Sequence, residues 1–115
     1  MQLVEPTKTI ELKELIIIAK QRYGNLVKAV VDIDKEEMLI DAELHADEEQ
    51  ELIKQGSKQK DLWGINLYPE LTGDDFVEFD SMINLRPSQG NNSRGVDDIK
   101  IQTRIRQIVS KLVRI

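Results

Sequence analysis

The chain has 115 residues, the size of one domain, and its composition of 40% hydrophobic and 32% charged residues excludes a largely disordered protein. Its longest apolar run, residues 15–19, is far shorter than the roughly 20 residues of a membrane-spanning helix. There is no cysteine, which excludes disulfides and thiolate zinc sites. The first residues lack the basic-then-apolar order of a signal peptide, so we expect a cytoplasmic protein with no membrane contact.

Charge is distributed unevenly around the formal net charge of −5. Residues 1–80 hold 9 Lys/Arg and 19 Asp/Glu, whereas residues 81–115 hold 7 and 2. A basic C-terminal surface is suited to a phosphate-containing small molecule or an acidic protein, although a simple dipolar monomer fits the same pattern. Aromatic residues do not interleave with these cations, so sequence-specific nucleic-acid binding is not expected.

The first predicted element is a helix over residues 10–23. Thr9 can cap its N-terminus, and Gly24 can end it. Its apolar side chains recur at helical spacings of three and four, at Leu12, Leu15, Ile16, Ala19 and Tyr23.

Two strands follow, because apolar residues alternate over residues 27–33 and 38–44. A loop at residues 35–36 places Val31 opposite Ile40 and puts the apolar side chains of both strands on one face. Neither loop residue favours a type I′ turn, so the turn can also be longer by one or two residues.

A short acidic helix is predicted over residues 46–55, followed by a second hairpin with strands over residues 63–67 and 77–85. In this hairpin Ile65 is expected to face Phe79. The remaining elements are a loop with Pro, Gly and Asn and a closing helix. The apolar stripe of that helix is Ile101, Ile105, Ile108, Val109 and Leu112.

Together these elements predict one α+β domain over residues 1–115. It would be a two-layer sandwich of a four-stranded, mostly antiparallel sheet with three helices on one face, in the order α-β-β-α-β-β-α. The uncovered face would expose the apolar side chains of Leu26, Val30, Leu39, Leu62, Phe76 and Met82. We therefore expect a homodimer that forms through this outer sheet face.

Three blocks carry a resemblance to a known family: ELHADEE (43–49), QGSKQKDLWGINLYPE (55–70) and EFDSMINLRPSQGNNSRGV (78–96). Over about residues 10–113 the chain resembles a family of short prokaryotic proteins catalogued as a domain of unknown function. The resemblance implies a small prokaryotic protein and brings no catalytic residue with it.

Residues 86–95, immediately before the last helix, are the strongest candidate for a ligand site. Arginine side chains and exposed backbone amides are groups that bind anions. The candidate anion-binding residues are Arg86, Ser88, Asn91, Asn92, Ser93 and Arg94. Lysine and arginine continue the basic surface along the helix, at Lys100, Arg104, Lys111 and Arg114. Alternatively this segment is a capping loop, whose arginines pair with Asp97, Asp98 or Glu70.

A second candidate is a divalent metal site around His45, the one histidine in the chain. Glu43 and Asp47 lie two residues to either side, and Asp80 could join them from the second hairpin. An ion pair between Glu43 and Lys28 explains the same residues without a metal.

These features favour a small cytoplasmic binding or interaction module, without a required cofactor, over an enzyme. The alternative is a metal-dependent phosphoryl or nucleotide hydrolase. Such an enzyme would bind the metal through Glu43, His45, Asp47 and Asp80, with Arg86 and Arg94 on the phosphate.

Overall fold

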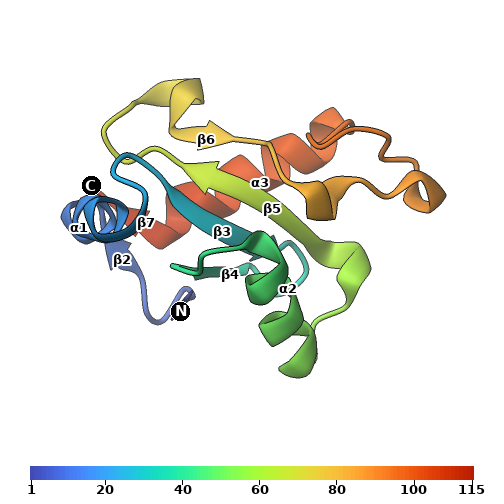
Figure 1. Cartoon of the computed structure of the whole chain (residues 1–115), viewed down its shortest axis with the longest axis horizontal. Helices are drawn as coiled ribbons and strands as arrows, with labels where there is room; N and C mark the ends of the chain where they lie inside the picture. The colour runs from blue at the N-terminus through green and yellow to red at the C-terminus, as the bar shows by residue number, and fades with distance from the viewer.

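A five-stranded sheet forms the centre of the computed structural model, which describes residues 1–115 (Figure 1). Its strand order is β1-β4-β3-β5-β6, and all neighbouring strands are antiparallel. The strands of this sheet are β1 (Gln2–Val4), β3 (Val27–Asp32), β4 (Glu37–Ile40), β5 (Leu62–Leu67) and β6 (Val77–Glu78). A separate parallel pair joins β2 (Ile10–Glu11) to β7 (Val113–Arg114).

Three α-helices and four short 3₁₀ helices complete the fold. The α-helices are α1 (Leu12–Arg22), α2 (His45–Lys54) and α3 (Ile99–Leu112). The 3₁₀ helices are η1 (Gln59–Asp61), η2 (Gly73–Phe76), η3 (Met82–Asn84) and η4 (Pro87–Gln89). None of the helices is long and apolar enough to cross a membrane.

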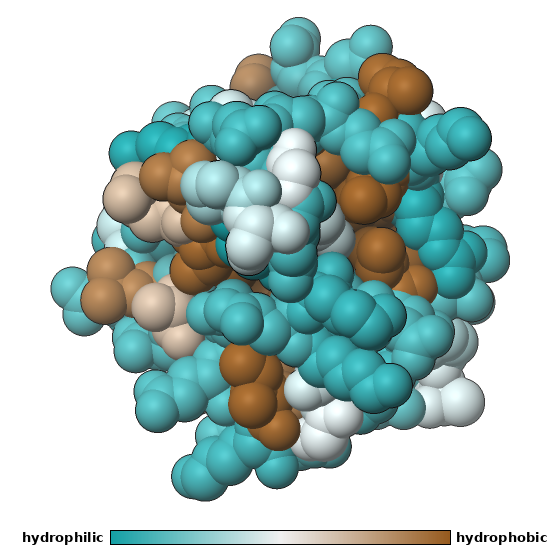
Figure 2. All heavy atoms as spheres, turned by 90° about the vertical axis from the view of Figure 1, so that its right-hand side faces the viewer, coloured by the Kyte–Doolittle hydropathy of each residue, from teal (hydrophilic) through white to brown (hydrophobic).

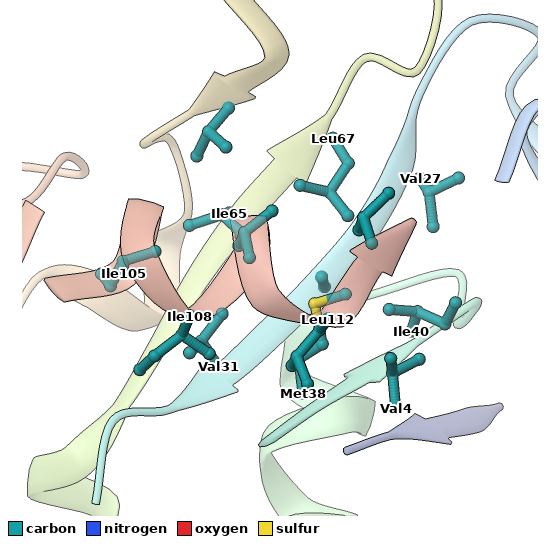
Figure 3. Close-up of a cluster of buried hydrophobic side chains, with 14 of the residues drawn as sticks. Val4, Val27, Val31, Met38, Ile40, Ile65, Leu67, Ile105, Ile108 and Leu112 are labelled. Carbon is teal, nitrogen blue, oxygen red and sulfur yellow. The ribbon is translucent and has the colours of Figure 1, made fainter. Parts of the chain in front are cut away.

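The main core lies between the sheet and the helices α1 and α3. Ile105, Ile108 and Leu112 of α3 face the sheet side chains, among them Val31 and Ile65 (Figure 3). The stripe predicted for the last helix is confirmed: of its five members only Ile101 is partly exposed. Nineteen buried hydrophobic residues form this one cluster, so it supplies most of the apolar burial that stabilises the fold.

Helix α2 lies on the opposite face of the sheet, so the prediction of three helices on one face was wrong (Figure 1). Its Leu52 packs on Val30, Leu39 and Leu62, which form a second, smaller cluster. The chain leaves β4 through Asp41, whose φ of 66° is left-handed, and then begins α2. Periodicity predicts that a helix has an apolar side but does not say which sheet face that side covers.

The covering by α2 also changes the expectation of a dimer. Val30, Leu39 and Leu62 are buried within the chain, and of the six residues predicted on that face only Met82, at 63% exposure, is largely open. The assumption that this face is uncovered was therefore wrong. Homodimerisation stays a prediction, without this face as its support.

The register of the first hairpin differs from the tighter of the two predicted turns. Val31 pairs with Met38, and Ala29 pairs with Ile40, because the turn spans residues 33–36. A shift of two residues preserves the face on which each side chain lies, so the predicted core face is confirmed. The second strand ends at Ile40.

The second predicted hairpin is correct only at its turn end. Leu67 pairs with Val77 as expected, but β6 ends at Glu78 and the pairing of Ile65 with Phe79 does not form. In place of a longer strand, the side chain of Asn84 meets the free edge of β5. Its Oδ1 accepts from the Gly64 N–H at 2.8 Å, and its Nδ2 donates to the Gly64 carbonyl at 2.9 Å.

The start of the first helix and the number of strands also differ from the prediction. The first helix begins at Leu12 rather than residue 10, and Thr9 does not cap it, because Ile10 and Glu11 pair with β7. The expected four strands become five because β1 adds to the edge of β4. With three residues, β1 is too short for its alternation to be recognised.

A Gly64→Ala variant is expected to lose about 1 to 2 kcal/mol of unfolding free energy. A β-carbon at this position would lie 2.6 Å from both Cβ and Oγ of Ser81, closer than packed atoms approach. Urea denaturation of this variant and of the double variant Gly64→Ala/Ser81→Gly tests whether the clash with Ser81 causes the loss of stability. The double variant is expected to recover part of the lost stability. An equal loss in both variants would contradict the clash as its cause.

Candidate functional site

Arg86, the first residue of the predicted anion loop, points into the protein. The side chain is 8% exposed, and its guanidinium lies 4.1 Å from the ring centroid of Trp63. Nη1 donates to the Gln59 carbonyl at 2.5 Å, and Nη2 donates to the Leu62 carbonyl at 2.7 Å. Burial lowers the pKa of Arg86, and the nearby carboxyl of Glu49 opposes this effect. Arg86 therefore joins η1 and β5 through their carbonyls.

Asn91 is buried, and its side chain holds the loop through hydrogen bonds to backbone groups in and beside it. Its Nδ2 donates to the carbonyls of Asn84, Ser93 and Gly95, at 2.7, 3.2 and 2.9 Å. Its Oδ1 accepts from the backbone N–H of Asp97 at 2.8 Å. All these partners belong to the chain, so Asn91 determines the shape of the loop.

The carboxylate of Asp97 occupies the position where an anion was expected. It accepts from the backbone N–H of Asn92 at 2.7 Å and from the hydroxyl of Ser93 at 2.5 Å. These two hydrogen bonds lower the pKa of Asp97. Asp98 then caps α3 by accepting from the Lys100 N–H at 2.9 Å. The loop and the helix terminus thus direct these donors to acidic side chains of the same chain.

Arg94 lies at the surface and pairs with Asp80, its Nε 2.8 Å from Oδ1. Both arginines thus bond groups of the same chain, as the capping alternative expected. Their partners differ from the expected Asp97, Asp98 and Glu70. Ser88 is exposed in η4. Arg86 and Arg94 do not converge, because one is buried against Trp63 and the other pairs with Asp80. Anion binding by residues 86–95 stays a prediction that this geometry does not favour.

The predicted metal site is not formed. His45 is the first residue of α2, and its buried ring places Nε2 2.7 Å from the Ile65 carbonyl. Glu43 and Asp47 are exposed, and Asp80 pairs with an arginine. No group of three or more His, Cys, Asp or Glu side chains in the structure could hold a metal ion. The hydrolase alternative therefore lacks the metal site on which it depends.

A groove of about 480 Å³ lies between α3 and the connection from β5 to β6. This volume falls within the range of small-molecule sites. Its apolar lining includes Leu12, Leu71, Phe76, Val77, Val109, Val113 and Ile115. Its polar lining includes Glu70, Thr72, Asp74, Arg106 and Ser110. None of the residues predicted to bind an anion or a metal is among them.

Arg106 supplies the positive charge in the wall of this groove. Its guanidinium lies 4.9 Å from the ring centroid of Phe79, which orients the side chain. Nη1 donates to the Asp74 carbonyl at 3.3 Å and lies 3.9 Å from the Asp74 carboxylate. Asp74 is almost fully exposed, so water screens this ion pair and it holds Arg106 weakly.

The basic stripe predicted on α3 is partly neutralised. Arg104 donates to the Ile33 carbonyl at 3.0 Å and lies 3.7 Å from Glu36. Lys111 lies 3.2 Å from the same carboxylate. The hydrogen bond from Lys111 and the two positive charges lower the pKa of Glu36. The stripe is thus not a continuous free cationic surface.

The end of the molecule that carries the 86–95 loop shows hydrophobic residues as separate patches among hydrophilic ones (Figure 2). No single broad apolar surface covers this end. Its appearance fits the scattered hydrophobic residues of an ordinary protein surface better than a large docking interface.

Comparison with protein families places the chain in one of them. A family model described as "Protein of unknown function (DUF5674)" matches residues 3–112, nearly the whole sequence. The chain belongs to the DUF5674 family. The resemblance to a domain of unknown function is thereby confirmed. Neither the curated proteins nor the solved structures give a significant match.

Sequence reasoning missed the groove because its walls come from three separate parts of this DUF5674 protein, at Leu12, residues 69–77 and residues 106–115. Residues 69–75 were expected only as a connecting loop, yet Leu71 lies among their polar residues. Phe76, which was expected on the outer sheet face, lines the groove as well. Val113 and Ile115 likewise extend the apolar residues past the end of α3. These apolar residues were the signal that could have indicated the site.

Proposed function

We propose that this DUF5674 protein is a binding module for a small apolar molecule that carries one anionic group. The groove beside α3 is the site, and the observation that carries the proposal is its apolar lining with the guanidinium of Arg106 in one wall, where Glu70 and Asp74 are exposed to water. Sites of this kind bury the apolar part of a ligand and use a few polar groups to orient it.

Arg106 supports the anionic character of the ligand. Its present partner, the Asp74 carboxylate, is exposed and 3.9 Å away, so a carboxylate or phosphate held in the groove can replace it. Exclusion of water by the apolar lining strengthens such a pair. The proposal thus keeps the anionic ligand expected from the sequence and places it at Arg106 instead of Arg86.

Anilinonaphthalene sulfonate is a suitable probe, because it joins apolar rings to one anionic group. We expect the native chain to bind it and Arg106→Gln to weaken binding about fivefold to tenfold, the effect of losing one charge-assisted hydrogen bond. Ser110→Trp is expected to abolish binding, because Ser110 is exposed in the groove and a large ring there fills it. Fluorescence titration measures all three affinities.

Arg104→Gln is the matched control, since Arg104 lies on α3 but contacts Ile33 outside the groove. It should bind the probe like the wild type. Competition then identifies the ligand chemistry: octanoate and octyl phosphate should displace the probe, and inorganic phosphate should not. Unchanged affinity in both Arg106→Gln and Ser110→Trp would refute this site.

A further inference from the structure

Helix α2 is attached to the sheet by few apolar contacts. Three of its side chains are buried, and of these only Leu52 is apolar, the others being His45 and Glu48. Beneath it lie the apolar side chains of Val30 and Leu39, with Leu62 beside them. The helix therefore covers an apolar surface while contributing little apolar surface of its own.

Glu48 is 0% exposed, and the structure pairs its carboxyl with no cation. Oε2 accepts from the Ala42 N–H at 3.1 Å, and Oε1 has no hydrogen-bond partner. The charged groups around it are Lys28 on β3, Asp41 before α2 and the N-terminal amine of Met1. Burial raises the pKa of Glu48 to about 9, against opposing effects of the Ala42 N–H and Lys28. Under neutral conditions the carboxyl is thus protonated.

His45, one turn before Glu48, is also held neutral. Burial lowers its pKa, and its hydrogen bond to the Ile65 carbonyl opposes this. The charged groups that face it are Lys28 from β3 and Asp80 from the segment after β6. The two buried ionisable side chains of α2 are thus neutral while the helix is in place. Glu49, partly buried on the same helix, also has a pKa raised by burial, and the charge of Arg86 opposes this effect.

Backbone turns flank α2 on both sides. Asp41 has a φ of 66° before the helix, and Gly56 has a φ of 103° after it. Each is a left-handed position at which the chain reverses direction. Because the turns lie outside the helix, α2 can leave the sheet by rotation at these two points without unwinding.

We propose that α2 is a proton-linked lid, whose lifting exposes Glu48 to water, releases one proton from its carboxyl to the solvent and uncovers Val30, Leu39 and Leu62. The closed lid requires the protonated carboxyl. In the open state Glu48 is an ordinary exposed carboxyl that ionises under neutral conditions. Proton linkage then makes the opening constant rise about tenfold per pH unit between about 6.5 and about 9. At lower pH the exposed His45 takes up a proton on opening, which cancels this rise. This device is separate from the groove beside α3.

Amide hydrogen exchange of the full chain tests the lid between about pH 7 and about pH 8.5, where His45 is neutral in the closed state and mostly neutral in the open state. After correction for intrinsic rates, protection of the α2 amides in the wild type should fall tenfold per pH unit. It should also be at least tenfold lower than protection in α3. In Glu48→Gln the α2 protection should not depend on pH, whereas Asp47→Asn, an exposed neighbour, should behave like the wild type.

Two results would overturn the proposal. Equal protection in α2 and α3 would mean that α2 opens only when the whole chain unfolds. A slope that persists in Glu48→Gln would mean that another group supplies the proton. Lower protection in α2, with a slope that disappears only in Glu48→Gln, supports the lid.

Discussion

An Arg86→Ala variant is expected to lose about 3 to 5 kcal/mol of unfolding free energy. The substitution removes two hydrogen bonds from a charged donor. It leaves the Leu62 carbonyl without this partner, while the Gln59 carbonyl still accepts from the Leu62 N–H. It also removes the guanidinium from the face of Trp63. Urea denaturation followed by circular dichroism measures the difference.

Arg94→Ala is the matched control from the same loop. Arg94 is more than half exposed and forms a surface ion pair with Asp80, so its loss should change stability by only about 0 to 1 kcal/mol. Similar effects in the two variants would contradict the structural role assigned to Arg86.

A Glu48→Gln variant is expected to be more stable than the wild type, by about 2 to 3 kcal/mol at neutral pH. The pKa of Glu48 is raised by burial from 4.5 to about 9, so the folded state keeps a proton that the unfolded state releases. The contribution of this group is therefore fully favourable below about pH 4.5 and is lost as pH rises towards about 9. Glutamine cannot ionise and avoids this loss, although its second amide hydrogen needs a partner.

Thermal unfolding of wild type and Glu48→Gln across this pH range measures the effect. The stability difference should be small near pH 4.5 and should grow with pH. Asp47→Asn, the exposed neighbour in α2, should show no such growth. A difference that is independent of pH would mean that Glu48 is already charged in the folded protein.

The strand faces could be predicted because alternation alone determines them. Val31 and Ile40 share the core face whether the turn has two residues or four. The register could not be predicted, since it depends on the turn, where Glu36 takes a left-handed φ of 55°. The face covered by α2 was not predictable either, because it depends on the direction in which the chain leaves Asp41.

The polar residues of the block over residues 78–96 suggested a ligand site because arginine side chains and exposed backbone amides are groups that bind anions. In the structure they replace missing backbone pairing. Asn84 bonds the edge of β5, Asn91 holds three carbonyls and Arg86 reaches two more. A sequence shows which side chains can donate or accept hydrogen bonds but not which groups they bond. Residues that bind a ligand and residues that hold a loop therefore look the same in the sequence.

The groove beside α3 is assembled from segments that only the tertiary fold brings together. Neither the 69–76 connection nor the residues after Leu112 carry a recognisable binding motif. Arg106 does not belong to the basic stripe predicted on the last helix, and its position beside Phe79 came only from the fold. Sites of this kind require the structure for their recognition.

Nuclear magnetic resonance mapping of bound octyl phosphate on the ¹⁵N-labelled chain tests the proposed function most directly. The ligand offers an apolar tail to the groove and a phosphate to either Arg106 or the 86–95 loop. We expect the largest shift changes at the backbone amides of Leu71, Phe76, Arg106 and Ser110, which line the groove. Changes centred on residues 86–95, with the groove unaffected, would contradict the proposal and restore the loop as the anion site.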